Sequence, residues 1–511
     1  MQNNDKKVLL RISNLKQYFP LKGGRFVKAN DGITLDIYEG ETFGLVGESG
    51  CGKSTLGRTI LQLYHQTYGR TMYYGRSLDD LAPKYVIDTV KNLKARRTKL
   101  RELEQKRDKL EADYAKLSEK EQYAKHGELD TARKLAEDAL LDITKIVGGF
   151  LVVDDLDPVI AAYSKDYAIA RKLSSMEEKR QELQVDVDDA EYAKKTAEEA
   201  GKSGKDDQLQ KAQEKLKQCD EQIAALRAQL DAGRKEIEAL RAPYANDPEF
   251  QKYEAYRDDG IDLARLEYNE MRRLRRDMQL IFQDPYSSLN PRMSVGQIIS
   301  EGMQAHNMIK KKDARMQEMV LKIMDDCGLA PYFLHRFPHQ FSGGQRQRIG
   351  IARALATKPK FVVCDEAVSA LDVSIQAQII NLLLDLKEQQ NLTYMFITHD
   401  LSVVKYISDR VGVMYLGTMV ELAAADEIFH HPIHPYTEAL LNAIPTTDTV
   451  GAKELSILEG DIPSPVNPPK GCKFHTRCKY CTEICTQVVP EWEEVRPNHF
   501  VACHHKLEAK E

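Results

Sequence analysis

The stretch Gly47-Glu-Ser-Gly-Cys-Gly-Lys53-Ser54 decides the fold, because it fits the pattern G-x-x-x-x-G-K-[ST]. The residues directly before it, Thr42 to Val46, have the apolar character of a buried strand, and a helical pattern follows through Leu61. A glycine-rich loop between a strand and a helix turns successive backbone N–H groups toward a phosphate chain. Lys53 can reach the outer phosphates, and the Ser54 hydroxyl can ligate Mg²⁺. A chance glycine turn would not explain this context.

A pair of carboxylates closes a second apolar strand, predicted at residues 361–364. This pattern suits Asp365 to the Mg²⁺ shell and Glu366 to polarising the attacking water. An Asp-Glu pair after a strand can also be a plain helix N-cap. However, Ser-Ala-Leu-Asp372 follows it, and His399 stands at the end of the next predicted strand. The sequence therefore predicts nucleotide hydrolysis on a parallel α/β core.

Composition limits the remaining possibilities. The chain has 511 residues, 42% hydrophobic and 30% charged, which indicates more than one domain. A net charge of -5 and a pI of about 6.3 provide no overall positive field, so nucleic acid is disfavoured as a partner. The apolar runs are far shorter than the roughly 20 residues that cross a bilayer, and the N-terminus lacks a secretory signal pattern. We expect a cytosolic chain that reaches the membrane through a partner.

A long charged block interrupts the core pattern. Its apolar or small residues recur at alternating steps of three and four: Leu209, Ala212, Leu216, Cys219, Ile223, Leu226, Leu230, Gly233, Ile237 and Leu240. Such an a/d seam is typical of a coiled coil, and a helix of about 35 residues would be roughly 50 Å long. We expect antiparallel helical hairpins here. The expected domains are an ATPase in two segments (1–82 and 263–445, with a helical subdomain at about 288–350), a coiled-coil insertion (83–262) and a Cys-rich tail (446–511).

Three further motifs resemble those of ABC ATPases. Phe341-Ser-Gly-Gly-Gln345 resembles their signature, Gln283 in Ile-Phe-Gln-Asp-Pro their Q-loop, and His399 in Ile-Thr-His-Asp their switch histidine. The resemblance implies an α/β P-loop fold with an antiparallel β subdomain and a helical subdomain. It implies that Glu366, His399 and Gln283 are catalytic, and that Ser54, Gln283 and Asp365 hold Mg²⁺. The implied ATP contacts are Tyr18, Gly47, Glu48, Ser49, Gly50, Cys51, Gly52, Lys53, Ser54, Thr55, Gln283, Asp365, Ser342, Gly343, Gly344, Gln345 and Asp372.

Two of these expected ATP contacts need a further remark. One involves a nucleotide bound by another subunit, and the other has competing candidate residues. The Ser342 hydroxyl and the neighbouring glycine N–H groups would bind the γ-phosphate of a nucleotide held by another subunit. Tyr18 is the expected adenine-stacking aromatic, with Phe19 and Phe26 as competitors and plain core packing as the alternative.

The subfamily is also recognisable. The stretches 283–293, 369–378 and 434–441, together with the tail, look like those of ATPase subunits of oligopeptide or dipeptide importers. That resemblance implies a second, paralogous ATPase subunit, two transmembrane permeases docked around residues 283–293, and an extracytoplasmic peptide-binding protein. It places the chain at the cytoplasmic face of the membrane. Two features depart from the family: Ala367 replaces the usual proline, and the helical block is an addition without a family function.

Five of the nine cysteines cluster in the tail. Cys472, Cys478, Cys485 and Cys503 resemble the four cysteines of the family tail, and Cys481 is additional. Four thiolates suit Zn²⁺ or a [4Fe-4S] cluster, and the lack of paired C-x-x-C knuckles favours iron–sulfur. His475 or His504 could replace one ligand. Reduced cysteines packed as small apolar groups remain the alternative.

A chromosome-maintenance ATPase of the coiled-coil type is the rival class, because such proteins also split the cassette with a long coiled coil. In that class, however, the insertion follows the Q-loop, whereas here it precedes Gln283. No C-x-x-C hook occurs in the block, where Cys219 stands alone. We therefore expect the importer ATPase.

Overall fold

The computed structural model describes residues 6–201, 206–310, 315–443 and 460–507. The first five residues of the expected ATPase domain, and residues 446–459 and 508–511 of the expected tail, lie outside these ranges. The chain forms two compact units, one from residues 1–75 and 272–511 and one from residues 76–271. None of the described helices has both the length and the hydrophobicity needed to cross a membrane.

The main sheet of the first unit is parallel at its centre. Its order is β11-β12-β10-β9-β3-β8-β7-β6, and β3 pairs in parallel with β8 and β9, as β7 does with β6 and β8. The strands are β3 (Thr42–Val46), β6 (Met278–Ile281), β7 (Phe361–Asp365), β8 (Thr393–Ile397), β9 (Arg410–Tyr415), β10 (Thr418–Ala424), β11 (Glu493–Arg496) and β12 (His499–Val501). Strands β3, β7 and β8 are buried throughout, as their unbroken apolar runs require. Their carboxyl ends share one edge, which positions the site.

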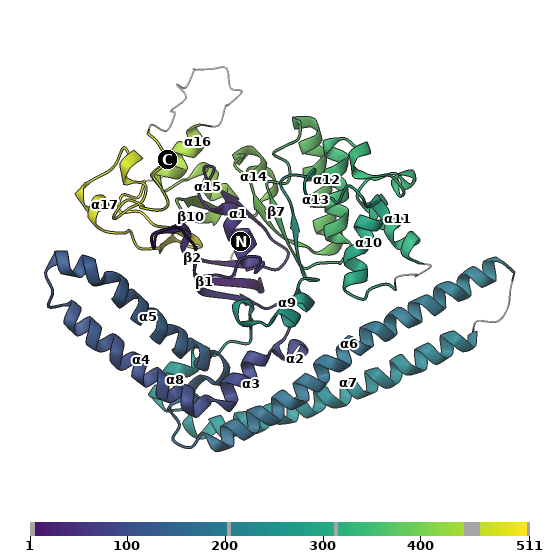
Figure 1. The fold of residues 1–511 in the computed structure, drawn as a ribbon, viewed down its shortest axis with the longest axis horizontal. Helices are drawn as coiled ribbons and strands as arrows, with labels where there is room; N and C mark the ends of the chain where they lie inside the picture. The colour runs from purple at the N-terminus through teal and green to yellow at the C-terminus, as the bar shows by residue number, and fades with distance from the viewer. Residues whose placement is uncertain (1–5, 202–205, 311–314, 444–459, 508–511) are drawn as a thin grey trace. The chain divides into compact units, whose positions relative to one another are not determined.

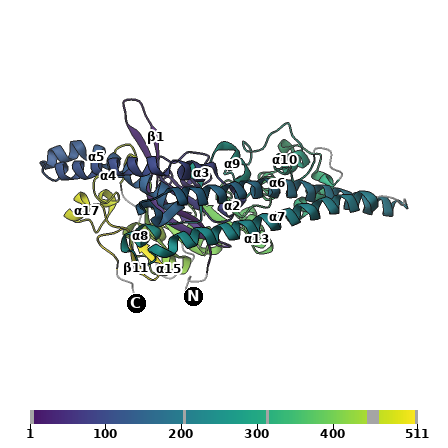
Figure 2. The same cartoon turned by 90° about the horizontal axis from the view of Figure 1, so that it is seen from below.

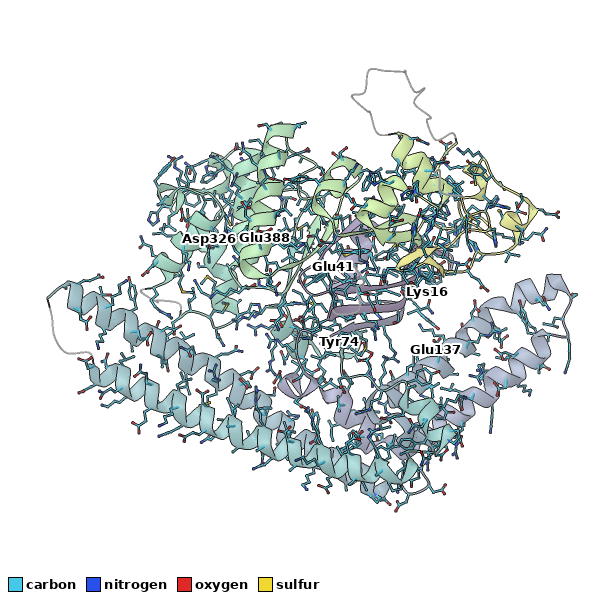
Figure 3. The ribbon with its side chains drawn as sticks, turned by 180° about the vertical axis from the view of Figure 1, so that it is seen from behind. Lys16, Glu41, Tyr74, Glu137, Asp326 and Glu388 are labelled. Atoms are coloured by element: carbon cyan, nitrogen blue, oxygen red, sulfur yellow. The ribbon has the colours of Figure 1, made fainter. Side chains whose placement is uncertain are left out.

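A smaller antiparallel sheet joins β2 (Phe26–Tyr38), β1 (Val8–Pro20) and β4 (Tyr68–Tyr73) in that order. Figure 3 marks this region by Lys16 on β1 and by Tyr74 directly after β4. Along much of β1 and β2, buried residues alternate with partly buried or exposed ones, which is the pattern of a sheet with one covered face.

The first unit also contains helices. They are α1 (Lys53–Ile60), α10 (Val295–Ala305), α11 (Met316–Asp326), α12 (Gly343–Leu355), α13 (Val373–Gln390), α14 (Leu401–Ile407), α15 (Ala425–His430), α16 (Pro435–Asn442) and, in the tail, α17 (Glu483–Gln487). Helices α10 to α13 lie together (Figure 1) and share one apolar core with β7 and β8. The exposed Asp326 and Glu388, labelled in Figure 3, mark their solvent side. Helices α10 and α11 fall in the segment expected as the helical subdomain, at about 288–350, and α12 begins in it and ends beyond it, at Leu355.

The second unit is helical. It contains α2 (Leu78–Leu81), α3 (Lys84–Lys91), α4 (Leu93–Tyr114), α5 (Glu119–Val147), α6 (Asp157–Glu199), α7 (Asp206–Arg241), α8 (Pro248–Glu254) and the short strand β5 (Ile261–Asp262), and the chain returns to the first unit within α9 (Tyr268–Leu274). Two hairpins dominate it, α4 with α5 and α6 with α7. In Figure 2, seen from below, α6 and α7 again run side by side.

The buried residues of α7 are members of the predicted seam, except for Arg241 at its end: Cys219, Ile223, Leu230, Gly233 and Ile237. Three of them pack with α6 residues such as Tyr167 and Leu173. Supercoiling of the pair stays a prediction. The unit also begins before the expected boundary at residue 83, because Ala82 belongs to its core and its carbonyl oxygen accepts a hydrogen bond from Tyr167 Oη at 3.0 Å.

Candidate functional site

The glycine loop between β3 and α1 can be built only with glycine at two positions. Gly47 and Gly52 have φ values of 149° and 105°. A Cβ at Gly47 would lie 2.2 Å from the Met414 carbonyl oxygen, and one at Gly52 would lie 2.1 Å from the Ala29 carbonyl oxygen. Any side chain would therefore collide with rigid backbone and widen the loop. The loop leads straight into α1, whose N-terminal N–H groups favour anions.

Lys53, the first residue of α1, is held beneath this loop. Its Nζ donates to the Gly47 carbonyl oxygen at 2.7 Å and to the Glu48 carbonyl oxygen at 3.0 Å. The residue is only 4% exposed. A buried ammonium group beside a ring of backbone donors forms a compact positive site, which suits a phosphate chain.

Asp365 is the last residue of β7, and only one of its two carboxylate oxygens has a hydrogen-bond partner. Its Oδ2 accepts a hydrogen bond from Arg58 Nη2 at 3.1 Å, while its buried Oδ1 has no hydrogen-bond partner. A buried carboxylate oxygen without a partner is costly unless a cation binds it. The residue therefore fits a Mg²⁺ site, because Mg²⁺ prefers oxygen ligands and is usually bound by one or two carboxylates together with substrate phosphates.

Glu366 connects two further side chains from neighbouring strand ends. Gln283 Nε2, after β6, donates to Glu366 Oε2 at 2.6 Å, and His399 Nδ1, after β8, lies 3.5 Å from Glu366 Oε1. Because β6, β7 and β8 are parallel neighbours, the three residues meet at one edge. Glu366 has φ 48°, a left-handed conformation that is strained for a non-glycine residue and is often found at functional sites.

The loop from Ser49 onward, together with Gln283, Glu366 and His399, lines one open pocket of about 510 Å³ in the first unit; Asp365 is not part of this lining. Its walls are Phe19, Val27, Lys28, Ala29, Ser49, Gly50, Cys51, Gly52, Lys53, Ser54, Thr55, Gln283, Glu366, His399, Gly417 and Pro465. The pocket thus brings together the phosphate loop and the three candidate catalytic side chains.

Comparison with known proteins gives this pocket its context. A model of the ABC transporter family matches residues 30–251 and 251–369. The chain belongs to the ABC transporter family. A second model, the C-terminal region of oligopeptide/dipeptide transporters, matches residues 420–485.

Three curated relatives match this ABC ATPase over much of their own length. The putative oligopeptide transport ATP-binding protein YkfD of Bacillus subtilis is 34% identical over 498 residues, 97% of this chain and 95% of that protein. The oligopeptide transport ATP-binding protein AppF of the same organism is 52% identical over 250 residues, 48% of this chain and 75% of that protein. A putative peptide import ATP-binding protein of Brucella ovis is 54% identical over 245 residues, 48% and 77% of the two chains. These similarities favour a transporter ATPase over the chromosome-maintenance class.

The residues that resemble the ABC signature, Ser342 to Gln345, and the nearby Asp372 lie outside this pocket. Ser342 caps α12, where its Oγ accepts from the Gln345 N–H at 3.4 Å, and Asp372 caps α13. Gly344 faces Ile375 so closely that a Cβ would lie 2.5 Å from its Cγ2. None of these residues, nor Gly343, lines the pocket of the same chain. Ser342 is exposed.

The aromatic wall of the pocket is Phe19 and not Tyr18. The Tyr18 hydroxyl donates to Asp31 Oδ1 at 2.5 Å, which ties that ring to a polar cluster. Burial would raise the pKa of Asp31, but Lys473, the Tyr18 hydroxyl and Lys16 together hold the pKa below its usual range. Of the three aromatic residues considered for stacking, Phe19 is the one that lines the pocket.

The sequence analysis did not predict that the tail contributes to the site. Pro465 lines the pocket, and Arg477 forms an ion pair with Glu48 of the loop at 2.7 Å. Tyr436, which lies on α16 before the tail, accepts a hydrogen bond through its hydroxyl from the Glu48 N–H at 2.9 Å. No sequence motif signalled these contacts, because they join residues almost 400 or more positions apart.

The predicted metal centre at Cys472, Cys478, Cys485 and Cys503 is not supported. In the described ranges no three His, Cys, Asp or Glu side chains are grouped so as to hold a metal ion. Burial raises the pKa of Cys472 to about 11 and of Cys503 to about 12, which favours neutral thiols. Cys472 and Cys478 pack against the apolar core around Phe474, as the packed-cysteine alternative expects.

The two histidines considered as substitute ligands are also engaged elsewhere. His475 Nδ1 lies 2.8 Å from the Cys472 carbonyl oxygen, and His504 Nε2 lies 2.9 Å from the Val488 carbonyl oxygen. Both rings thus form hydrogen bonds with backbone oxygens. Within residues 460–507, the described part of the tail, the structure therefore does not support a zinc or iron–sulfur centre.

Proposed function

We propose that this chain is the ATP-hydrolysing motor subunit of a peptide importer. One observation carries the proposal: the Glu366 carboxylate, the Gln283 amide and the His399 ring converge on the pocket that also contains the phosphate loop. The similarity to named oligopeptide transport ATP-binding proteins and to their C-terminal region supports peptides as the cargo.

The residues divide the work of phosphate binding. Backbone N–H groups from Gly47 to Thr55 and the Lys53 ammonium would hold the phosphate chain, and Phe19 would stack on the base. Ser54, Asp365 and Gln283 would hold Mg²⁺, and Asp365 Oδ1, which is buried without a hydrogen-bond partner, is available as a ligand. Bound Mg²⁺ supplies charge neutralisation on the β- and γ-phosphate oxygens.

The remaining side chains act on the water and the γ-phosphate. Glu366 would accept a proton from the attacking water, as a general base does. The hydrogen bond from Gln283 Nε2 fixes one carboxylate oxygen and leaves the other facing His399. His399, whose side chain is 60% exposed, is free to turn and hydrogen-bond the γ-phosphate.

The pocket is complete only with a second ATPase chain. The signature residues Ser342 to Gln345 and Asp372 lie outside it, so a partner's copies would close over the nucleotide. We propose a paralogous ATPase subunit as that partner, with two transmembrane permeases and an extracytoplasmic peptide-binding protein completing the importer at the cytoplasmic face of the membrane.

Uptake of a radiolabelled peptide tests the proposal in cells whose transporter carries either wild-type chain or Glu366→Gln. We expect uptake and ATP hydrolysis to fall at least about 10²-fold, the usual scale for a positioned general base, while ATP binding persists. Glu388→Gln is the matched control, because Glu388 is exposed on α13 away from the pocket. Normal peptide uptake by the Glu366→Gln transporter would refute the assignment.

A further inference from the structure

The cysteine-rich tail is anchored to the ATPase core by a buried aromatic residue. Phe474 is 2% exposed, and its ring centroid lies 5.2 Å from those of both Tyr415 and Tyr436. Three residues further on, the short 3₁₀ turn His475–Arg477 ends in Arg477. The anchor therefore fixes the backbone that presents this arginine.

Arg477 reaches the phosphate loop itself. Its Nη1 and Nη2 donate to the two carboxylate oxygens of Glu48 at 2.7 Å and 3.0 Å, which is a bidentate pair. The side chains are only 4% and 22% exposed. An ion pair this well shielded is not weakened by solvent in the way that a surface pair is.

Glu48 is consequently held through all of its polar groups. Its N–H donates to Tyr436 Oη, its carbonyl oxygen accepts from Lys53 Nζ, and its carboxylate accepts from Arg477. Glu48 directly precedes Ser49, the first loop residue that lines the pocket. If Glu48 stays in place, the loop can present its N–H groups to phosphate without rearranging. Donors that are preorganised in this way bind more tightly.

We propose that Arg477 is a positioning residue for nucleotide binding, which holds the phosphate loop in its binding conformation through Glu48. The tail thereby becomes a component of the ATP site and sets its affinity. This inference rests on the proposed function of the pocket, because it assumes that the loop binds ATP.

The rest of the tail does not depend on this ion pair. Strand β12 pairs with β10, and His499 Nε2 lies 2.8 Å from the buried Glu421 Oε1. We expect Phe474 to stay in the core when the charge at position 477 is removed, because its ring packs on Tyr415 and Tyr436. Loss of the arginine charge should therefore loosen the loop while the tail stays docked, which separates positioning from a merely structural role.

The test compares Arg477→Gln, Arg477→Lys, Glu48→Gln and the double variant of full-length protein. We expect Arg477→Gln to raise the Kd for Mg-ATP about tenfold, within the usual range of site-to-site coupling. Arg477→Lys should recover some of the loss, because it restores the charge without the bidentate geometry. Glu48→Gln should weaken binding similarly, and the double variant should be no worse than either single one. In the ATPase assay the change should fall mainly on KM.

Lys479→Gln is the matched control. Lys479 Nζ pairs with Glu438 at 3.0 Å, so it also joins the tail to the core but does not touch the loop. Alkylation of the buried Cys485, read by mass spectrometry, monitors whether the tail stays docked. Unchanged affinity in Arg477→Gln and Glu48→Gln, or an equal loss in Lys479→Gln, would overturn the inference. Absence of ATP binding by the wild-type chain would instead refute the proposed function.

Discussion

We expect the charged carboxylate of Asp166 to destabilise the helical unit at neutral pH. Replacing this residue with a neutral one should therefore stabilise the unit. The residue lies on α6 opposite Gly233 of α7, where a Cβ would stand 2.7 Å from Asp166 Oδ1. That oxygen is buried and has no hydrogen-bond partner. Burial, and secondly the charge of Asp79, raise the pKa of Asp166 to about 6 despite the opposing effect of Arg234.

The sign follows from proton binding. A carboxyl group with a pKa raised in the folded state binds more protons there than in the unfolded chain between about pH 4 and pH 6. Stability therefore falls as the pH rises through this window, and the full penalty applies above it. The shift from 3.8 to about 6 corresponds to at most ~3 kcal/mol, and partial solvent access reduces the expected value to about 1–1.5 kcal/mol.

Amide hydrogen exchange of the intact protein measures this locally, because it reports opening of individual helices. In Asp166→Asn we expect α6 and α7 to gain about 1–1.5 kcal/mol of protection at about pH 8 and clearly less at about pH 5. Asp231→Asn serves as the control, since Asp231 is exposed on α7. An equal gain at both pH values, or no gain at pH 8, would show that the Asp166 charge is not the cause.

Three other changes have defined outcomes. Phe474→Ala should cost about 3–5 kcal/mol locally by leaving a cavity, seen as faster alkylation of Cys485; an unchanged rate would mean that another contact anchors the tail. Gly47→Ala should abolish ATP binding in a folded protein, because its Cβ meets backbone; retained binding would show that the loop can widen. Replacing residues 82–261 by a short Gly/Ser linker should keep ATP affinity within a few-fold, since every residue lining the pocket lies in the other unit; loss of binding with an intact core would assign the insertion to the site.

The core of the site was predictable because its signals are local. The loop Gly47–Ser54 follows β3, Asp365 and Glu366 stand at the end of β7, and His399 comes after β8. Parallel pairing alone therefore brings them to one edge. No geometry between distant segments had to be known. The P-loop fold of the ABC family follows from the same motifs.

The aromatic residue could not be assigned in this way. Alternate residues of a strand face opposite sides, so Tyr18 and Phe19 compete for one position. The pairing of β1 with β2 is irregular between Gln17 and Tyr18, and such a shift changes which residue faces the pocket. The alternation of residues along the strand therefore could not decide whether Tyr18 or Phe19 faces the pocket. Likewise, the spacing of Cys472, Cys478, Cys485 and Cys503 fixed neither the direction of their thiols nor the distances between them.

The place of the insertion explains why a block of nearly 200 residues can interrupt an intact catalytic unit. It enters after β4, which belongs to the antiparallel sheet, and the chain returns before β6, which pairs with β7 of the parallel sheet. The entropic cost of a longer connection grows only slowly with its length. The pocket residues lie before Gly75 or after Arg272, so the carboxyl edge of the parallel sheet can assemble independently of the helices. Selection on the helical unit can thus act on its own surface while the chemistry at Glu366 stays constant.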